Sequence, residues 1–318
     1  MRSLAGLWLA LALAGCALSP AHVPDPLPLE PGRLPAPDIA VKVPRLGPCT
    51  DSPERTVHLN SSQPVTVLVH GCNGSAGHFR SLAQLYAFHG QQAVCFSYDD
   101  RDSLMVSSRQ LIGALDELAG HLRGSSIAVI GHSMGGLVAR KALEAERSAQ
   151  WRSNPDLRLA TVSAPVSGIA VASTCGLTAV HWLSLGVVPG MCWMITGDNW
   201  FEITKHSDFI RLPGPLLPSV QRYLKVVTDE RGTCRRRALD GSCIESDFIF
   251  TLGEQYHPVV DKYPRMTNIE VDAGHVEIVG YKDVAPRKLL EILQRENMLA
   301  PTPPARRAAL ERLLAILY

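Results

Sequence analysis

The sequence has almost no excess of charge of either sign. Its 318 residues include 31 lysines and arginines against 30 aspartates and glutamates, which gives a net charge of +1. No overall field therefore draws the chain toward nucleic acid or another polyanion. A nucleic-acid partner is not expected, and a polyanionic substrate is not expected either.

The short motifs that mark metal and nucleotide sites are also missing. The sequence contains no His-Glu-x-x-His, no Walker loop and no Gly-x-Gly-x-x-Gly, and its eight cysteines lack the spacing of zinc ligands. The sequence therefore implies no metal and no organic cofactor.

The apolar run near the N-terminus is too short to span a bilayer as a mature helix. It covers residues 4–13, follows Arg2 and ends at Leu-Ala-Gly-Cys16, which resembles the bacterial lipobox. The resemblance implies that residues 1–15 are a signal peptide and that Cys16 is lipidated. Because Ala17 follows the cysteine, it further implies anchoring in the outer membrane of a bacterial cell envelope.

Export would place the other seven cysteines where disulfides persist, and an odd number leaves one of them over. Two pairs are the most economical predictions, because each pair brackets one short segment. These pairs are Cys175 with Cys192, and Cys234 with Cys243. Three cysteines compete for a third bridge: Cys49, Cys72 and Cys95.

Prolines recur every few residues from 19 to 48, with little apolar periodicity. This composition favours an extended segment, so residues 16–50 are predicted to be a tether between the lipid anchor and a folded domain. For the later half of the segment, an arm packed on the domain is an equal alternative, and Cys49 could fix it there.

Beyond residue 50, short runs rich in valine and isoleucine alternate with stretches of helical periodicity, which predicts a doubly wound, mostly parallel α/β domain over 51–298. The expected strands are 65–69, 93–98, 126–130, 157–163, 223–228 and 269–271. The expected helices are 78–89, 107–123, 135–146 and 287–294. Residues 299–318 are expected to form a helical tail, amphipathic from 305 onward.

One connection is too long for an ordinary loop. It spans about 168–218 and carries several large apolar side chains, among them Trp182, Trp193 and Met194. An inserted lid that presents apolar surface to a substrate is one interpretation, and additional core helices are the other.

The expected strand at 126–130 leads directly into Gly-His-Ser-Met-Gly-Gly at 131–136 and then into a helical continuation. A strand, a sharp turn and a helix are the setting of a nucleophile elbow, in which the glycines avoid steric clashes around a strained serine. The pentapeptide alone is weak evidence, but this setting makes Ser133 a strong candidate nucleophile.

Upstream, the first core strand ends in His70-Gly71-Cys72. Together with the Gly-His-Ser-Met-Gly-Gly turn, this segment resembles the lipase and esterase branch of the α/β-hydrolase superfamily, over about residues 65–293. The resemblance implies that the backbone N–H groups of Cys72 and Met134 form an oxyanion hole. His70 precedes the nucleophile and is not predicted to be the base.

A serine hydroxyl needs a general base, which in this superfamily comes last along the chain. Asp-Ala-Gly-His at 272–275 follows the last expected strand and provides His275. The acid should lie between Ser133 and His275 in the sequence. Asp247 is favoured because its segment is similar to a lipase acid segment, although Phe248 stands where glycine is usual. Three alternatives remain, namely Asp229 at a strand end, Glu254 and Asp261.

The resemblance implies a serine carboxylic-ester hydrolase that forms an acyl-enzyme. The apolar insertion and the lipid anchor favour lipidic or other apolar esters as substrates. Two alternatives stay open, because one scaffold serves many reactions. The triad could serve an acyltransferase or a thioesterase, or the chain could be a non-catalytic envelope lipoprotein.

Overall fold

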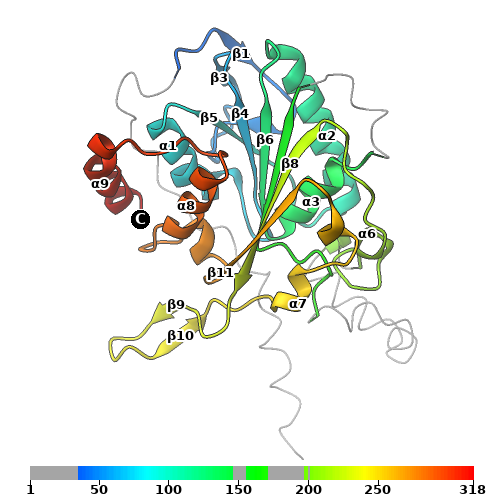
Figure 1. Ribbon diagram of the computed structural model, residues 1–318, viewed down its shortest axis with the longest axis vertical. Helices are drawn as coiled ribbons and strands as arrows, with labels where there is room; N and C mark the ends of the chain where they lie inside the picture. Colours follow the sequence, from blue (N-terminus) through cyan, green and yellow to red (C-terminus); the bar gives the residue numbers. More distant parts are fainter. Residues whose placement is uncertain (1–34, 146–154, 171–196, 200) are drawn as a thin grey trace, which may run out of the picture.

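The computed structural model describes residues 35–145, 155–170, 197–199 and 201–318 (Figure 1). Its centre is a seven-stranded sheet in the order β11-β8-β7-β6-β4-β5-β2. All neighbouring strands are parallel except β2 and β5, so the predicted doubly wound α/β fold is confirmed. The strands are β2 (Leu46–Gly47), β4 (Val65–Val69), β5 (Gln92–Phe96), β6 (Ile127–His132), β7 (Leu157–Val162), β8 (Val220–Asp229) and β11 (Met266–Asp272).

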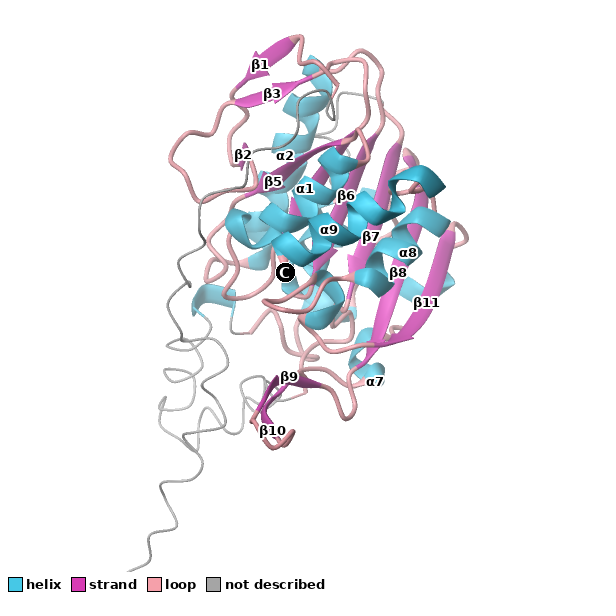
Figure 2. Cartoon of the chain, turned by 90° about the vertical axis from the view of Figure 1, so that its left-hand side faces the viewer, coloured by secondary structure: helices cyan, strands magenta, loops and turns pink. Residues whose placement is uncertain are grey.

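Helices cover both faces of the sheet, and the sheet separates the core into two layers (Figures 1 and 2). One layer contains side chains from α2 (Leu104–His121), α3 (Met134–Ala142) and α6 (Asp208–Arg211). The other contains side chains from α1 (Arg80–Phe88), α8 (Arg287–Arg295) and α9 (Arg307–Leu317). Because both faces are covered, central strands such as β4 are buried along their whole length and read as continuous apolar runs.

The later half of the expected tether is packed on the domain. Strand β1 (Ile39–Val41) pairs with β3 (Val57–Leu59), and β2 extends the large sheet at its β5 edge. A disulfide joins Cys49 to Cys95 within β5. These contacts correct the expected domain start, which lies before residue 51. Cys16 and residues 17–34 lie outside the described residues.

The C-terminal tail also belongs to the domain, because α9 packs against the sheet layer that contains α1 and α8. Leu314 is buried there, and Tyr318 contacts the same cluster. Part of the expected insertion is core as well, since Ile203, Phe209 and Ile210 join the opposite layer. Its central residues 171–196, including Cys175 and Cys192, lie outside the described residues.

The carboxyl ends of the parallel strands meet at one edge of the sheet. Beyond this edge lie α7 (Leu252–Gln255) and a hairpin of β9 (Cys234–Arg237) and β10 (Cys243–Ser246) (Figure 2). The order of the strands reverses between β4 and β6, and such switch points are where open α/β sheets bind ligands. In the described part of the chain, no helix combines the length and the apolar character needed to cross a membrane.

Candidate active site

Ser133 occupies the sharp turn between β6 and α3, where the chain leaves the sheet at its carboxyl edge. Its backbone has φ 56° and ψ −128°, a conformation that few residues other than glycine adopt. The turn is held by the N–H of Ser133, which donates to the carbonyl of Val162 on the next strand at 2.9 Å. This strained strand-to-helix turn is the geometry that the sequence predicts for a nucleophile.

The glycines around Ser133 allow the turn because their neighbours leave no room for a side chain. A Cβ on Gly131 would lie 2.3 Å from the carbonyl oxygen of Gly135. A Cβ on Gly135 would lie 2.2 Å from the carbonyl oxygen of His70, on the adjacent β4 turn. Both clashes involve backbone atoms that cannot rotate away, so the spacing of the motif follows from close backbone packing.

The predicted oxyanion residues come from the two turns that meet at this point. Met134 is the first residue of α3, so its N–H lies at the N-terminal end of that helix. Cys72 follows Gly71, where an added Cβ would be only 2.8 Å from the Cβ of Ser133. The structure therefore brings the turn that carries Cys72 against the serine, as the sequence predicts.

His275 faces a carboxylate that the sequence prediction missed. Its Nδ1 lies 2.9 Å from Oε1 of Glu230, the residue directly after β8, and both side chains are buried. The ring of His275 also lies 4.8 Å from that of His132, the residue before Ser133. The end of β6 and the loop after β11 thus meet, and Glu230 contacts the ring of His275 at Nδ1.

Burial alone would raise the pKa of Glu230, but the opposing contacts prevail and lower it. The causes that lower the pKa are the hydrogen bond and positive charge of His275 and two backbone N–H groups. Those N–H groups belong to Ile249 and Phe250, which donate to Oε2 at 2.6 and 2.8 Å. The site therefore holds Glu230 as a carboxylate, the form that stabilises an imidazolium.

Hydroxyl groups at the ends of β7 and β8 complete the surroundings of Glu230. Ser163 donates to Oε1 at 2.8 Å and lies 2.9 Å from Nδ1 of His275. Thr228 donates to Ser163 at 2.7 Å, and its own N–H is bound by the buried Gln255. This network fixes the carboxylate and favours the tautomer of His275 with hydrogen on Nδ1.

The structure corrects the predicted acid. Asp247 is buried, but its carboxylate accepts the backbone N–H groups of Val276 and Glu277 and contacts Arg235. It does not contact the ring of His275. Glu230 contacts the ring of His275, whereas Asp247 contacts the backbone of the same loop, and the resemblance to a lipase acid segment does not distinguish these two contacts.

The other acids considered from the sequence are also engaged elsewhere. Asp229 binds Arg231 at the surface, Glu254 caps the helix α7, and Asp261 binds the buried Lys225 at 2.6 Å. Asp229 was considered because it ends β8, and the carboxylate that contacts His275 belongs to the next residue, Glu230. Alternation along β8 sends neighbouring side chains to opposite faces, so Glu230 reaches the site when Asp229 does not.

Two other histidines near Ser133 have structural contacts. Nε2 of His132 donates to the carbonyl oxygen of His275 at 2.8 Å, and Nδ1 of His70 donates to that of Gly71 at 3.0 Å. Burial is the main cause that lowers the pKa of His132 to about 3 and that of His70 to about 4. Both rings are therefore neutral near pH 7, and His275 is the histidine with a carboxylate partner.

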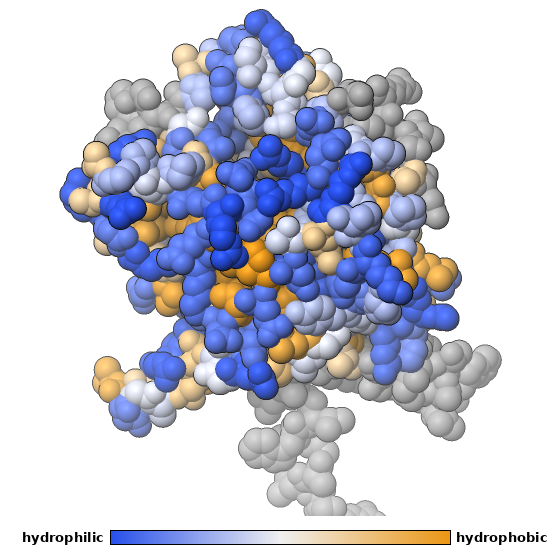
Figure 3. Space-filling model, in the orientation of Figure 1, coloured by the Kyte–Doolittle hydropathy of each residue, from blue (hydrophilic) through white to orange (hydrophobic). Residues whose placement is uncertain are grey.

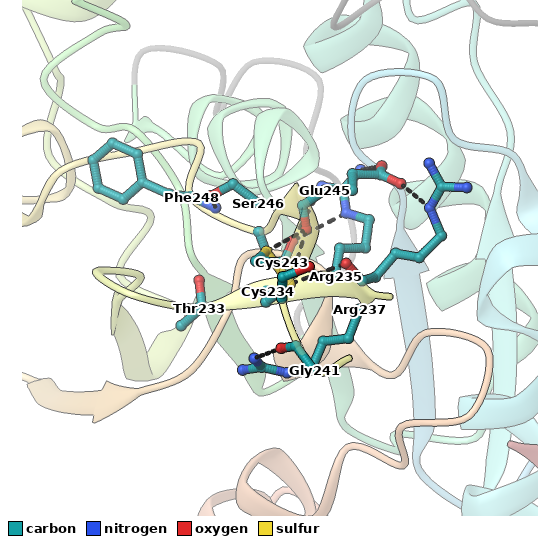
Figure 4. The surroundings of a disulfide bond; sticks show 12 residues. Thr233, Cys234, Arg235, Arg237, Gly241, Cys243, Glu245, Ser246 and Phe248 are labelled. Carbon is teal, nitrogen blue, oxygen red and sulfur yellow. Dashed lines mark hydrogen bonds and ion pairs between the residues drawn. A yellow bond between two sulfur atoms is a disulfide. The ribbon is translucent and has the colours of Figure 1, made fainter. Parts of the chain in front are cut away.

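One of the predicted disulfides is present among the described residues, and a second bridge joins two of the three cysteines that were left open. The predicted bridge between Cys234 and Cys243 is present and closes the β9–β10 hairpin (Figure 4). Of the three cysteines competing for another bridge, Cys49 and Cys95 form it, and Cys72 belongs to neither. Among the described residues, no group of three or more potential ligands could hold a metal ion.

A doubly wound sheet with a strained serine at a switch point and a buried histidine and carboxylate after later strands defines the α/β-hydrolase class. The chain belongs to the alpha/beta hydrolase family, whose model matches residues 66–311. No curated protein matches the chain by sequence.

Solved structures of similar fold include lipases and esterases. The lipase BlEst2 of Bacillus licheniformis in its propeptide form is 15% identical with a TM-score of 0.53, over 81% of this chain and 54% of that one. Its mature form is 16% identical with a TM-score of 0.48, over 79% and 96% of the two chains. Esterase B from Lactobacillus rhamnosis is 14% identical with a TM-score of 0.46, over 83% and 87%. The chain thus spans about half the length of the propeptide form, and at 15% identity this likeness concerns the fold.

Proposed function

We propose that this hydrolase is a serine carboxylic-ester hydrolase that works through an acyl-enzyme. Ser133 is the nucleophile, His275 the general base and Glu230 the acid. The observation that carries the proposal is the buried contact of 2.9 Å between Glu230 and Nδ1 of His275, beside the strained Ser133 turn. A neutral histidine with hydrogen on Nδ1 leaves Nε2 to accept a proton.

The reaction follows from these roles. Nε2 of His275 takes the hydroxyl proton of Ser133 as its oxygen attacks the ester carbonyl, and Glu230 stabilises the imidazolium through Nδ1. The N–H groups of Cys72 and Met134 stabilise the developing oxyanion. The imidazolium then protonates the leaving alkoxide, which departs as the alcohol. Water then gives a proton to His275 and attacks the acyl carbon. The bond from the acyl carbon to the oxygen of Ser133 breaks, the imidazolium returns the proton to that oxygen, and the carboxylic acid leaves.

We further propose that the substrates are apolar esters. The ring of Phe250 packs edge-on against His275, with centroids 4.8 Å apart. The two residues before it, Phe248 and Ile249, leave 42% and 45% of their surface exposed beside the carboxylate partner. Exposed apolar groups next to a catalytic site suit an acyl or alkyl chain. The predicted lipid anchor at Cys16, in the bacterial envelope, would place such a site near lipid.

Labelling with a fluorophosphonate probe tests the nucleophile. The native protein should form a covalent adduct at Ser133, and Ser133→Ala should not. As a matched control, Ser62→Ala removes an exposed serine remote in the sequence and should label like the native protein. Absence of labelling in the folded native protein would refute the catalytic proposal and leave the non-catalytic alternative.

Substrate class is tested with two series of acyl donors. Rates on p-nitrophenyl esters of increasing acyl length should rise from acetate toward longer chains if apolar contacts contribute to binding. Matched thioesters should react more slowly than the oxygen esters. A preference for thioesters, or transfer to an added alcohol in place of water, would instead favour the thioesterase or acyltransferase alternative on the same triad.

Lipidation is a separate proposal with its own test. Expression of the full chain in a bacterium fed with labelled palmitate should yield a labelled, membrane-associated protein. Cys16→Ala should remove the label and leave a soluble or unprocessed product. An unlabelled wild-type protein would exclude the lipid anchor without affecting the triad.

A further inference from the structure

Asp247 holds the backbone of the loop that carries His275. Its own carbonyl oxygen accepts the N–H of His275 at 2.9 Å. Its carboxylate accepts the N–H of Val276 at 3.1 Å and that of Glu277 at 3.0 Å. Three successive backbone donors of one loop therefore end on one buried residue, Asp247.

Gly274 makes room for the carboxylate. A Cβ at this position would lie 2.1 Å from Oδ2 of Asp247. The loop can approach the aspartate so closely only because residue 274 is glycine. The glycine before His275 is therefore needed for the close packing of the loop against Asp247, and not only for the sharp bend of the loop.

Arg235 orients the same carboxylate from the hairpin. Its Nε and one terminal nitrogen contact Oδ1 of Asp247 at 3.2 and 3.1 Å, and its other terminal nitrogen contacts Glu245 across the hairpin at 3.2 Å. Figure 4 shows Arg235 beside the disulfide that joins Cys234 to Cys243. The disulfide therefore closes the short hairpin whose first strand supplies this arginine.

We propose that Asp247, oriented by Arg235 of the disulfide-closed hairpin, is a positioning residue that holds the His275 loop in its catalytic place. This inference rests on the proposed hydrolase function and adds residues that do not touch the reacting atoms. Displacement of a reacting group by about an ångström can slow a reaction by about a hundredfold, so loss of the contact should lower turnover more than substrate binding.

The test compares Asp247→Asn and Arg235→Gln in the full chain. Asp247→Asn keeps the size of the side chain but replaces an acceptor oxygen with a donor that repels the loop N–H groups. We expect kcat on a p-nitrophenyl ester to fall about 10- to 100-fold with KM nearly unchanged. Arg235→Gln should cause a smaller fall of the same kind, and it is the variant to use if Asp247→Asn fails to fold.

Amide hydrogen exchange supplies a readout that does not depend on activity. In both variants a peptide covering 273–280 should exchange about tenfold faster, with little change in peptides from β4 and β6. The matched control is Arg237→Gln, which replaces an exposed arginine of the same hairpin whose side chain donates to the carbonyl oxygen of Gly241 at 3.1 Å. It should match the wild type in both measurements.

The outcomes separate this proposal from the proposed function. Faster exchange at 273–280 together with the fall in kcat supports the positioning role. Unchanged kcat in folded Asp247→Asn, or a rise in KM alone, overturns it while leaving the hydrolase intact. A wild-type protein that neither labels with fluorophosphonate nor hydrolyses esters overturns the proposed function, and the positioning role with it.

Discussion

His132 and His275 are joined by a hydrogen bond of 2.8 Å, from Nε2 of the first to the backbone carbonyl of the second. The residue before the proposed nucleophile therefore fixes the residue proposed as base. The bond requires hydrogen on Nε2 of His132. Burial, with a smaller effect of the charge of His275, lowers the pKa of His132 to about 3, so the donating ring is neutral near pH 7. Below that pH the charged ring would be buried beside a second histidine.

This arrangement predicts that stability declines as the pH falls below about 6.5. The folded-state pKa values of His132 and His70, about 3 and about 4, lie below their ordinary 6.5, so the unfolded chain takes up protons first. Their contribution is complete above pH 6.5 and is lost progressively as the pH approaches the folded values. The lowered pKa of Glu230 acts in the same direction below its ordinary 4.5.

Urea unfolding at several pH values measures the effect. In His132→Gln the free energy of unfolding should depend less on pH between 6 and 4, by roughly 1.4 kcal/mol per pH unit. His58→Gln, which replaces an exposed histidine on β3, is the control and should keep the wild-type slope. A wild-type stability that is flat between pH 7 and 4 would contradict the argument.

Glu230→Gln should reduce kcat by about a hundredfold to ten-thousandfold with little change in KM. Glutamine keeps the size of the side chain but removes the charge that stabilises the imidazolium and can present the wrong group to Nδ1. The matched control is Asp229→Asn, whose carboxylate binds Arg231 at the surface. Equal losses in both variants would mean that the strand end, and not the carboxylate of Glu230, is required.

The sequence alone predicts the candidate site residues whose local sequence pattern is continuous along the chain. Ser133 was predicted because a strand, a turn and a helix around it leave a pattern that is continuous in sequence, and His275 was predicted from its place after the last strand. Glu230, the acid proposed here, was missed because it contacts His275 across 45 residues of sequence. The sequence does contain two adjacent acids, Asp229 and Glu230, at the end of β8. Because neighbouring side chains of a strand point to opposite faces, only one of the two can face His275.

For the later half of the N-terminal segment, the sequence leaves a tether and a packed arm open for a related reason. Proline recurrence describes a local backbone preference, but β2 is held by pairing with β5 and by the bridge from Cys49 to Cys95. Both contacts join segments more than 40 residues apart, as the bridge separation of 46 shows. No local pattern encodes them, and only the possible pinning by Cys49 hinted at the result.

Gly135→Ala should abolish fluorophosphonate labelling and lower stability. The new Cβ would lie 2.2 and 2.3 Å from the carbonyl oxygens of His70 and Val69, so the β4 turn and the elbow must separate. The control is Gly113→Ala within α2, where an added Cβ meets nothing within 4 Å. It should label normally and stabilise the protein by about 1 kcal/mol, as measured by urea unfolding. Normal labelling of Gly135→Ala would show that the elbow tolerates the shift.

Mild reduction should open the disulfide between Cys234 and Cys243 before the one between Cys49 and Cys95. Cys243 is exposed and Cys234 is half-buried, whereas Cys49 is 6% exposed and Cys95 fully buried, so a thiol reductant reaches the hairpin first. Alkylation of the native protein after increasing times in dithiothreitol, followed by mass spectrometry, should show modification of Cys234 and Cys243 first. Earlier modification of Cys49 and Cys95 would contradict this order.

Opening this bridge should also slow the enzyme, because β9 supplies Arg235 to Asp247. The double variant Cys234→Ser with Cys243→Ser should lose kcat in the same direction as Asp247→Asn but less, since the loop contacts of Asp247 itself remain. If the bridge matters only in this way, adding the double change to Arg235→Gln should cause little further loss. Additive losses would instead mean that the disulfide stabilises the site by a route that does not pass through Arg235.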